Sequence, residues 1–107
     1  GITNAVNAVR AHIPAGIKIE VETTNLAEVR EALATHADII MLDNMTTEQM
    51  KKCVAIADGT GAVLEASGNV TLANMAEVAA TGVDIVSVGA LTHSVKAFDI
   101  SLRIAKN

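Results

Sequence analysis

The strongest constraint on the fold is a repeat of strand-like segments, each ending in a polar residue, at intervals of about 22 positions. The first three segments end in Glu22, Asp43 and Glu65, which are 21 and 22 residues apart. The fourth segment places Ser87 and Gly89 at nearly the same point of the repeat. A repeat of this length holds one strand and one helix, which is typical of an array of βα units. In such arrays the parallel strands end at one rim, where barrel enzymes keep their active sites.

Hydrophobic periodicity and turn residues divide the chain into alternating helices and strands. Strands are predicted over residues 17–22, 38–43, 62–66 and 84–88. Helices are predicted over residues 2–12 and 26–35, from 46 or 47 to 57, from 71 to 82, and over 97–104. Side chains suited to the N-cap position stand before four of these helices, and they are Thr3 or Asn4, Thr24 or Asn25, Thr46 or Thr47, and Thr71. This order predicts a parallel sheet with right-handed crossovers.

Four parallel strands correspond to half of an eight-stranded barrel. The expected fold is therefore an α/β array of repeated βα units, half of a TIM-like barrel. The alternative is a small open sheet with helices on both faces. The first strand favours the barrel, because its face of Lys18, Glu20 and Glu22 is too polar to lie under a helix. A chain of 107 residues is expected to form one domain, over residues 1–107.

The composition favours aliphatic packing and argues against several classes of partner. Half of the residues are apolar but Phe98 is the only aromatic one, which suits parallel strands covered by helices. The net charge of −4 and the lack of aromatic stacking platforms argue against nucleic acid. No apolar run approaches the roughly 20 residues of a membrane span, and no signal peptide is recognised. Cys53 has no CxxC partner, so we interpret it as a packed thiol in a reducing, cytoplasmic compartment.

Glu22 and Asp43 end adjacent predicted strands and are the main candidates for chemistry. Two carboxylates at one rim suit a hard cation such as Mg²⁺, which takes one or two carboxylates together with waters and substrate oxygens. The same pair suits the hydroxyl groups of a sugar. A structural interpretation is that acids at strand ends are solvated or belong to helix caps, but three acids in phase favour a site. Glu20 and Glu65 have a second interpretation, as lumen residues paired with cations or with Lys18.

Two loops of small residues are candidates for phosphate binding. Ser67, Gly68 and Asn69 precede one predicted helix, and Gly89 stands in the corresponding loop one repeat later. Bare amides of such loops and of helix N-termini bind phosphate, and in barrels the last two strand–helix loops often form a phosphate site. His93 lies four residues after Gly89, where its ring can donate to a phosphate oxygen. Turns use the same small residues for structural reasons, so this interpretation depends on the presence of both loops.

A family resemblance covers almost the whole chain, and four segments carry it. They are IEVETTNLAEVREAL, ADIIMLDNM, LEASGNV and TGVDIVSVGALTHSVKAFDISL. The chain resembles the family of quinolinate phosphoribosyltransferase, also called carboxylating nicotinate-nucleotide pyrophosphorylase, and the joint presence of ADIIMLDNM and SVGALTHS is specific to it. Members of this family use Mg²⁺ and act in NAD biosynthesis. They convert quinolinate and phosphoribosyl pyrophosphate to nicotinate mononucleotide, carbon dioxide and pyrophosphate.

The resemblance implies a role for each candidate residue. Glu22 and Asp43 would be catalytic residues that face the ribose and the Mg²⁺ ion. The phosphate end would be bound by residues of the two small-residue loops, namely Ser67, Gly68, Gly89 and His93, to which the composition of the first loop adds Asn69. The partners implied are small-molecule substrates, and the family is also dimeric.

The chain departs from the family pattern in its basic residues. The family carries a Lys-(Asp/Glu)-Asn-His segment just upstream of the position of Gly1, and an N-terminal domain whose basic residues grip quinolinate. Here Lys18 is the only basic residue on a predicted strand. We therefore expect the C-terminal portion of a longer glycosyltransferase, a carboxylating nicotinate-nucleotide diphosphorylase that transfers a pentosyl group, and we expect this portion to be inactive alone. The alternative is a non-enzymatic βα module that binds a phosphorylated ligand or serves only as a folding unit.

A half-barrel leaves two strand edges open, at residues 18–22 and 85–88. Unpaired edges recruit other strands, and the second edge carries no guarding charge beyond Asp84. A symmetric dimer buries both edges by pairing them or by joining two half-barrels. We therefore expect a homo-oligomer, and a dimer in particular.

Overall fold

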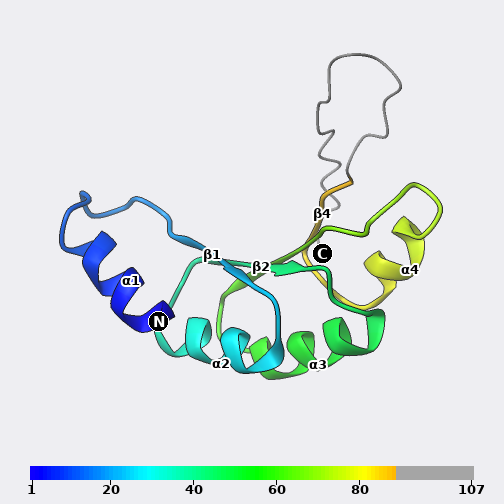
Figure 1. The fold of residues 1–107 in the computed structure, drawn as a ribbon, viewed down its shortest axis with the longest axis horizontal. Helices are drawn as coiled ribbons and strands as arrows, with labels where there is room; N and C mark the ends of the chain where they lie inside the picture. Colours follow the sequence, from blue (N-terminus) through cyan, green and yellow to red (C-terminus); the bar gives the residue numbers. More distant parts are fainter. Residues whose placement is uncertain (89–107) are drawn as a thin grey trace, which may run out of the picture.

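The computed structural model describes residues 1–88, in which four parallel strands alternate with four helices (Figure 1). The helices are α1 (Ile2–Arg10), α2 (Leu26–Ala34), α3 (Thr47–Ala57) and α4 (Met75–Ala80). The strands are β1 (Glu20–Thr23), β2 (Ile39–Asp43), β3 (Val63–Ser67) and β4 (Ile85–Val86). They form one sheet in the order β1-β2-β3-β4, which confirms the predicted array of βα units. The helix predicted over residues 97–104 lies outside the described residues.

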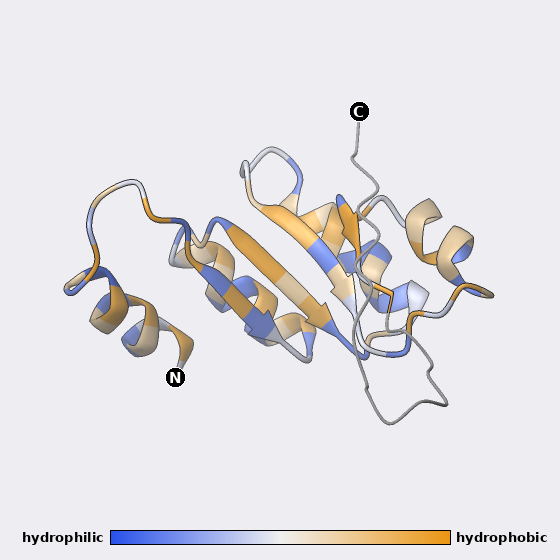
Figure 2. Ribbon diagram, turned by 90° about the horizontal axis from the view of Figure 1, so that it is seen from above, coloured by the Kyte–Doolittle hydropathy of each residue, from blue (hydrophilic) through white to orange (hydrophobic). Residues whose placement is uncertain are grey.

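Helices cover one face of the sheet. α2, α3 and α4 lie in an arc along this face, and α1 stands beside them at the end nearest β1 (Figure 1). Figure 2 looks onto the opposite face, where the strands lie in front of the helices. A doubly wound open sheet carries helices on both faces, so that alternative is wrong for the described residues. The arrangement is that of half of a TIM-like barrel, whose uncovered face corresponds to the lumen.

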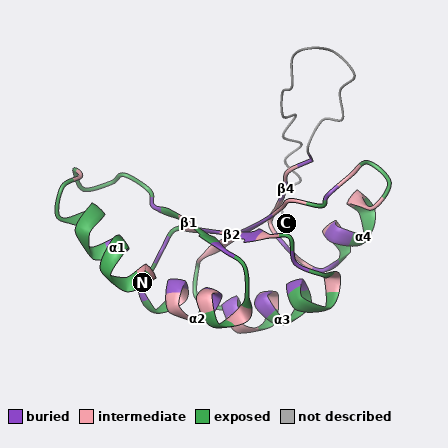
Figure 3. Ribbon diagram, viewed as in Figure 1, coloured by how far each residue is buried: buried purple, intermediate pink, exposed green. Residues whose placement is uncertain are grey.

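The covered face is the hydrophobic core. Alternate strand residues point toward the helices, and Ile40, Leu42 and Val86 are fully buried there (Figure 3). The helices contribute small aliphatic and sulfur-containing side chains to the same cluster, namely Val29, Ala32, Met50, Cys53 and Val78. This confirms the expected aliphatic core and the packed state of Cys53. Among the described residues, no helix has the length and apolar character needed to cross a bilayer.

The strand register arranges the uncovered face in rows. Glu22 pairs with Met41, Met41 pairs with Glu65, and Glu65 pairs with Ile85. These four residues form the middle row of the uncovered face. The row contains two carboxylates, but a Met side chain on β2 stands between them.

A second row lies one step nearer the carboxyl ends of the strands. Asp43 and Ser67 are paired in register there. The amide of Ser87 donates to the carbonyl of Ala66 at 2.9 Å, so the ladder between β3 and β4 continues past the end of β4. Asp43, Ser67 and Ser87 therefore form the rim row of the uncovered face. Every member of this row has a polar side chain.

Strand β1 begins later than the sequence predicts. The predicted strand covered residues 17–22, whereas β1 covers Glu20–Thr23, so Lys18 lies in the connection before the strand. The carboxylate of Asp38, directly before β2, accepts the amide of Ile19 at 2.8 Å, so this amide is bonded to a side chain rather than to a strand carbonyl. The polar strand face that favoured the barrel therefore loses its lysine and keeps its two glutamates.

Two of the predicted helix caps are confirmed. Asn25 Oδ1 accepts a hydrogen bond from the amide of Glu28 at 2.8 Å at the start of α2. Thr46 Oγ1 accepts from the amide of Gln49 at 3.1 Å, and Gln49 Oε1 accepts from the amide of Thr46 at 2.8 Å. This reciprocal pair is a capping box, which satisfies two free amides at the start of α3.

The predicted cap of α1 is wrong. Neither Thr3 nor Asn4 occupies the N-cap position, which belongs to Gly1 and has no side-chain hydrogen bond. A carboxylate of the neighbouring helix takes this role instead, because Glu31 Oε2 accepts from the amide and the hydroxyl of Thr3 at 2.9 and 3.0 Å. At the other end of α1, the Arg10 guanidinium donates to the carbonyl groups that end α2. Helix α1 is therefore fastened to α2 by polar contacts at both ends.

Candidate functional site

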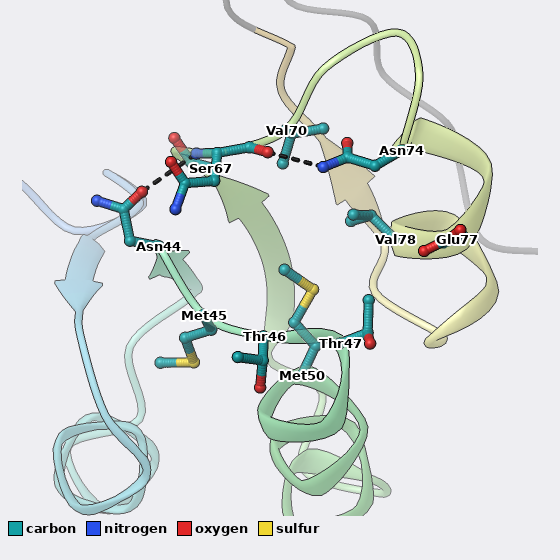
Figure 4. Close-up of a pocket in the computed structure, with 11 residues that line it drawn as sticks. Asn44, Met45, Thr46, Thr47, Met50, Ser67, Val70, Asn74, Glu77 and Val78 are labelled. Atoms are coloured by element: carbon teal, nitrogen blue, oxygen red, sulfur yellow. Dashed lines mark hydrogen bonds between the residues drawn. The ribbon is translucent and has the colours of Figure 1, made fainter.

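The carboxyl ends of β2 and β3 lie side by side and are joined through the turns that follow them. Asp43 and Ser67 are paired in register, and the next residue on each strand has a left-handed backbone, with φ of 55° at Asn44 and 74° at Gly68. The amide of Asn44 donates to the carbonyl of Ser67 at 3.1 Å. Asn44 Oδ1 accepts from the amide of Asn69 at 3.1 Å (Figure 4). These bonds fix both turns at the rim of the uncovered face.

Gly68 allows its turn to approach the side chain of Asp43. A Cβ atom at position 68 would lie 2.7 Å from Asp43 Oδ1 and closer still to Asn44 Oδ1, nearer than real side chains approach. The φ of 74° is itself unfavourable for any residue with a side chain. The structure therefore brings Asp43, Ser67 and Gly68 together, as the sequence predicts. Asn69 lies in the same turn, but its amide is already bonded to Asn44 rather than open toward a ligand.

Glu22 lies on the neighbouring strand and on the same face as Asp43. Its register partner on β2 is Met41, so Glu22 stands one row below Asp43 rather than beside it. The side chain of Glu22 is exposed and that of Asp43 is half-buried. The two predicted catalytic carboxylates are therefore diagonal neighbours that line one face.

This pair of carboxylates fits the chemistry of Mg²⁺. Within residues 1–88, no three acidic, His or Cys side chains are grouped closely enough to form a complete metal site. Mg²⁺ does not require such a group, because it commonly binds one or two carboxylates and completes its shell with waters and substrate phosphates. Glu22 and Asp43 are the described residues that would hold the ion.

Glu65 occupies the uncovered face, in agreement with its second interpretation as a lumen residue. Its side chain is 9 % exposed, and Glu65 Oε2 accepts a hydrogen bond from Ser87 Oγ at 2.7 Å. The expected cation is not beside it in the described part of the chain, where the ion pair present joins Lys51 and Glu48 on α3 at 3.7 Å. The partner of Glu65 is therefore the Ser87 hydroxyl, where the sequence analysis expected a basic side chain.

Two predicted phosphate-binding residues, Gly89 and His93, lie outside the described residues. Their roles stay predictions. The described part of the candidate phosphate site is therefore the turn of Ser67, Gly68 and Asn69.

A cavity of about 250 Å³ lies between α3 and α4, behind the rim (Figure 4). Its lining joins the start of α3 to the loop before α4, and it consists of Asn44, Met45, Thr46, Thr47, Met50, Ser67, Asn69, Val70, Asn74, Glu77 and Val78. Ser67 and Asn69 reach it, whereas Glu22, Asp43 and Gly68 are not part of its lining. The cavity is thus separate from the predicted carboxylate pair.

The sequence interpretation missed two asparagines that shape the site. Asn44 holds the two turns together, and an Asn directly after a buried strand is a signal for a left-handed turn residue. Asn74 Nδ2 donates to the carbonyl of Asn69 at 2.8 Å. Asn74 and Thr71 also exchange hydrogen bonds, at 2.7 and 3.2 Å, before α4 begins at Met75. The prediction that Thr71 caps the helix is therefore wrong, because Thr71 closes the preceding turn.

Comparison with known proteins identifies relatives over nearly the whole chain. Residues 1–103 match the family model described as quinolinate phosphoribosyl transferase, C-terminal domain. A Synechocystis protein named as a probable carboxylating nicotinate-nucleotide pyrophosphorylase is 46 % identical over 108 residues, which are 99 % of this chain and 37 % of the relative. The human carboxylating nicotinate-nucleotide pyrophosphorylase is 33 % identical over 106 residues, which are 97 % of this chain and 36 % of the relative.

A solved structure agrees with the sequence comparison. The nicotinate-nucleotide pyrophosphorylase from Francisella tularensis superimposes with a TM-score of 0.79 at 44 % sequence identity. The match covers 96 % of this chain and 37 % of that protein. The chain therefore spans little more than a third of the length of the relatives it matches.

Proposed function

Because the chain belongs to the quinolinate phosphoribosyl transferase family, whose C-terminal domain it matches over residues 1–103, we propose that it forms the sugar- and phosphate-binding half of an active site. The enzyme would convert quinolinate and phosphoribosyl pyrophosphate to nicotinate mononucleotide, carbon dioxide and pyrophosphate. One observation carries the proposal: Asp43 Oδ1 lies 2.7 Å from the point that a Gly68 Cβ would occupy. The Asp43 carboxylate, which suits sugar hydroxyls, and the Gly68 turn, which suits a phosphate, therefore lie together at one rim.

The carboxylates of Glu22 and Asp43 have two roles in this proposal. They accept hydrogen bonds from the ribose hydroxyls, and they place negative charge near the carbon from which pyrophosphate departs. Positive charge develops on a sugar ring as its leaving group departs, so carboxylates fixed nearby favour that step. Glu22 and Asp43 would also provide ligands for Mg²⁺. When bound, the ion would neutralise charge on the departing pyrophosphate.

The turn of Ser67, Gly68 and Asn69 serves the phosphate end of the substrate. Its glycine has no Cβ, and the side-chain oxygens of Asn44 and Asp43 lie where that atom would stand. Gly89 and His93 complete this part of the site in the proposal. The family membership of the chain supports an enzyme portion over the alternative of a free-standing βα module.

The full reaction requires groups beyond the described strands. These strands contain no Lys, Arg or His. Quinolinate carries two carboxylates, and an acidic sheet end repels them unless cations stand opposite. Since the chain spans about 37 % of its relatives, we propose that the missing cations belong to other parts of the enzyme and that the chain alone does not turn over.

Two measurements on the purified chain test this proposal. With quinolinate, phosphoribosyl pyrophosphate and Mg²⁺, we expect no formation of nicotinate mononucleotide. By calorimetry, we expect phosphoribosyl pyrophosphate with Mg²⁺ to bind, and Asp43→Asn to weaken binding about tenfold or more, since hydrogen bonds to a charged group are worth about 1.5–3 kcal/mol. Glu48→Gln, on the exposed side of α3, is the matched control and should leave binding unchanged. Equal affinity of Asp43→Asn and the unmodified chain would contradict the proposal.

The finer expectations about assembly and location also remain proposals. β1 pairs with β2 on one side only within the described sheet, and a strand edge without a partner recruits other strands. We expect sedimentation equilibrium to give a homodimer, with twice the 11.0 kDa mass of the chain. A single species of 11.0 kDa at high concentration would contradict it. The buried free thiol of Cys53 supports a reducing, cytoplasmic location, which fractionation of the source cells would test.

A further inference from the structure

Ser87 is joined to a buried carboxylate on the uncovered face. Its Oγ lies 2.7 Å from Glu65 Oε2, and the side chain of Glu65 is 9 % exposed. Ser87 is half-buried and stands in the rim row with Asp43 and Ser67. Neither Ser87 nor Glu65 has a role in the proposed function as described so far.

The bond determines what Ser87 can recognise. A carboxylate has no proton to give, so the Ser87 hydroxyl must be the donor. A serine has one hydroxyl proton, and when that proton points toward Glu65 the oxygen offers only lone pairs to its remaining surroundings. A phosphate oxygen is also an acceptor and makes a poor partner for such an atom. A hydroxyl group of a ligand makes a good partner.

The environment of Glu65 keeps this arrangement in place. Its register neighbours are Met41 on one side and Ile85 on the other, and neither can donate a hydrogen bond. Within residues 1–88, the bond from Ser87 is the one that the Glu65 side chain makes. A buried carboxylate that loses its donor is costly, and hydrogen bonds to charged groups are about twice as strong as neutral ones. The Ser87 hydroxyl therefore keeps donating its proton to Glu65 when a ligand binds.

We propose that Ser87 is a further binding residue, whose oxygen accepts a hydrogen bond from a hydroxyl group of the pentose. Glu65 is the positioning residue that fixes Ser87 as an acceptor. The inference rests on the proposed function, since it assigns the sugar to the same rim. It divides that rim by chemistry: Asp43 and Ser87 accept from sugar hydroxyls, and the Gly68 turn faces the phosphate.

The test compares affinities rather than activities. Dissociation constants for ribose 5-phosphate and for its 2-deoxy and 3-deoxy analogues are measured with the purified chain. The chain should bind one deoxy analogue about 3- to 10-fold more weakly than ribose 5-phosphate, since a hydrogen bond contributes about 0.5–1.5 kcal/mol. In Ser87→Ala the part of this discrimination that Ser87 provides should disappear, whereas the part that Glu22 and Asp43 provide should stay. A purely structural serine would change all three affinities by a common factor and leave their ratio intact.

Two substitutions of Glu65 test the positioning role. Glu65→Gln keeps an oxygen that accepts the Ser87 proton and should retain the discrimination. Glu65→Leu removes the acceptor, frees the hydroxyl to rotate, and should lose the discrimination as Ser87→Ala does. If circular dichroism shows that Glu65→Leu does not fold, the other two variants still test the inference. The ratio of the affinities for ribose 5-phosphate and the deoxy analogue should change in Ser87→Ala and should be retained in Glu65→Gln. Unchanged ratios in Ser87→Ala, or equal binding of all three sugars by the unmodified chain, would overturn the inference.

Asp43→Asn separates this inference from the proposed function. If Asp43→Asn weakens ribose 5-phosphate binding but Ser87→Ala leaves the ratio unchanged, the proposed function stands and the role of Ser87 is wrong. If Asp43→Asn has no effect on binding, the proposed function fails whatever the result for Ser87.

Discussion

The two faces of the sheet consist of alternate residues of the same strands, yet they differ in almost every physical respect. On the covered face, Ile40, Leu42 and Val86 are fully buried under the helices. On the uncovered face, Glu22 is exposed and Asp43 is half-buried. Because sequence neighbours share one backbone, the difference arises from the side chains and from what covers them. Among the described residues, one face packs against the helices and stabilises the fold, and the other face carries the carboxylates of the proposed site.

This separation means that substitutions on the two faces should have different consequences. A change on the covered face should lower stability through lost packing. A change on the uncovered face should alter binding and leave stability nearly intact. The predictions below test that division, beginning with the largest expected effect.

Leu42→Ala should cause the largest loss of stability. Leu42 is 0 % exposed, and removal of a fully buried leucine side chain costs about 2–5 kcal/mol. Met41→Ala, one residue earlier on the uncovered face, should cost less than half as much, because Met41 is only half-buried. Urea unfolding followed by circular dichroism measures both. Equal losses for the two variants would show that something also covers the second face.

Gly68→Ala should affect both stability and binding. Gly68 and Gly59 have similar left-handed φ values, 74° and 78°, which cost a residue with a side chain about 1–2 kcal/mol. A Cβ at Gly59 meets nothing within 4 Å, whereas one at Gly68 meets the side-chain oxygens of Asn44 and Asp43. Gly59→Ala is therefore the matched control for backbone strain alone. We expect Gly68→Ala to be the less stable of the two and to lose affinity for phosphoribosyl pyrophosphate, and the idea fails if both variants behave alike.

Cys53 reports on the integrity of the covered face. Burial raises the pKa of its thiol, so the folded chain holds this proton more tightly than the unfolded chain. The resulting stability is present below the ordinary thiol pKa of about 8.5 and decreases as the pH rises above it. We expect a thiol reagent to label Cys53 slowly in the native chain at neutral pH and fast in urea. We also expect the free energy of unfolding to decrease less at alkaline pH in Cys53→Val than in the unmodified chain. Rapid labelling of the native chain would contradict the burial of this face.

Glu31→Gln should have the smallest effect, at the margin of the fold. Hydrogen bonds from the amide and hydroxyl of Thr3 lower the pKa of Glu31. The stability that Glu31 contributes is therefore fully present above the usual glutamate pKa of 4.5. It is lost as the pH falls through the lower pKa of Glu31 in the folded chain. The protection of the α1 amides, measured as their exchange rate relative to the intrinsic rate at each pH, should fall in acid in the unmodified chain, and less so in Glu31→Gln. Glu48→Gln is the control, and an identical response of both variants would argue against the role of Glu31.

The sequence repeat predicted the elements well but not the rows of the sheet. Strand ends every 21 or 22 residues indicated the βα array and the rim correctly. Equal spacing also suggested that Glu22, Asp43 and Glu65 share one level. The register places Glu22 and Glu65 in one row with Met41 and raises Asp43 to the next. Pairing across the sheet depends on where each loop delivers the next strand, which spacing along the chain does not reveal.

Local and distant contacts explain the remaining differences. The caps at Asn25 and Thr46 were predictable because the bonded groups are three residues apart. Glu31 caps α1 from 28 residues away, and Glu65 meets Ser87 from 22 residues away. No local pattern identifies such partners, because they depend on how helices and strands pack. The family resemblance supplied residues of the rim but not the bonds that orient them.

The central claim is that the rim of the uncovered face, rather than the cavity between α3 and α4, binds the substrate. Titration of the ¹⁵N-labelled chain with phosphoribosyl pyrophosphate and Mg²⁺ tests it directly, because each amide reports its own surroundings. We predict that the amides of Asp43 and Gly68 shift with ligand concentration, and that Asp43→Asn requires about tenfold more ligand to reach half of the full shift. Shifts confined to the cavity-lining residues Thr47 and Val78, with the rim unchanged, would contradict the account.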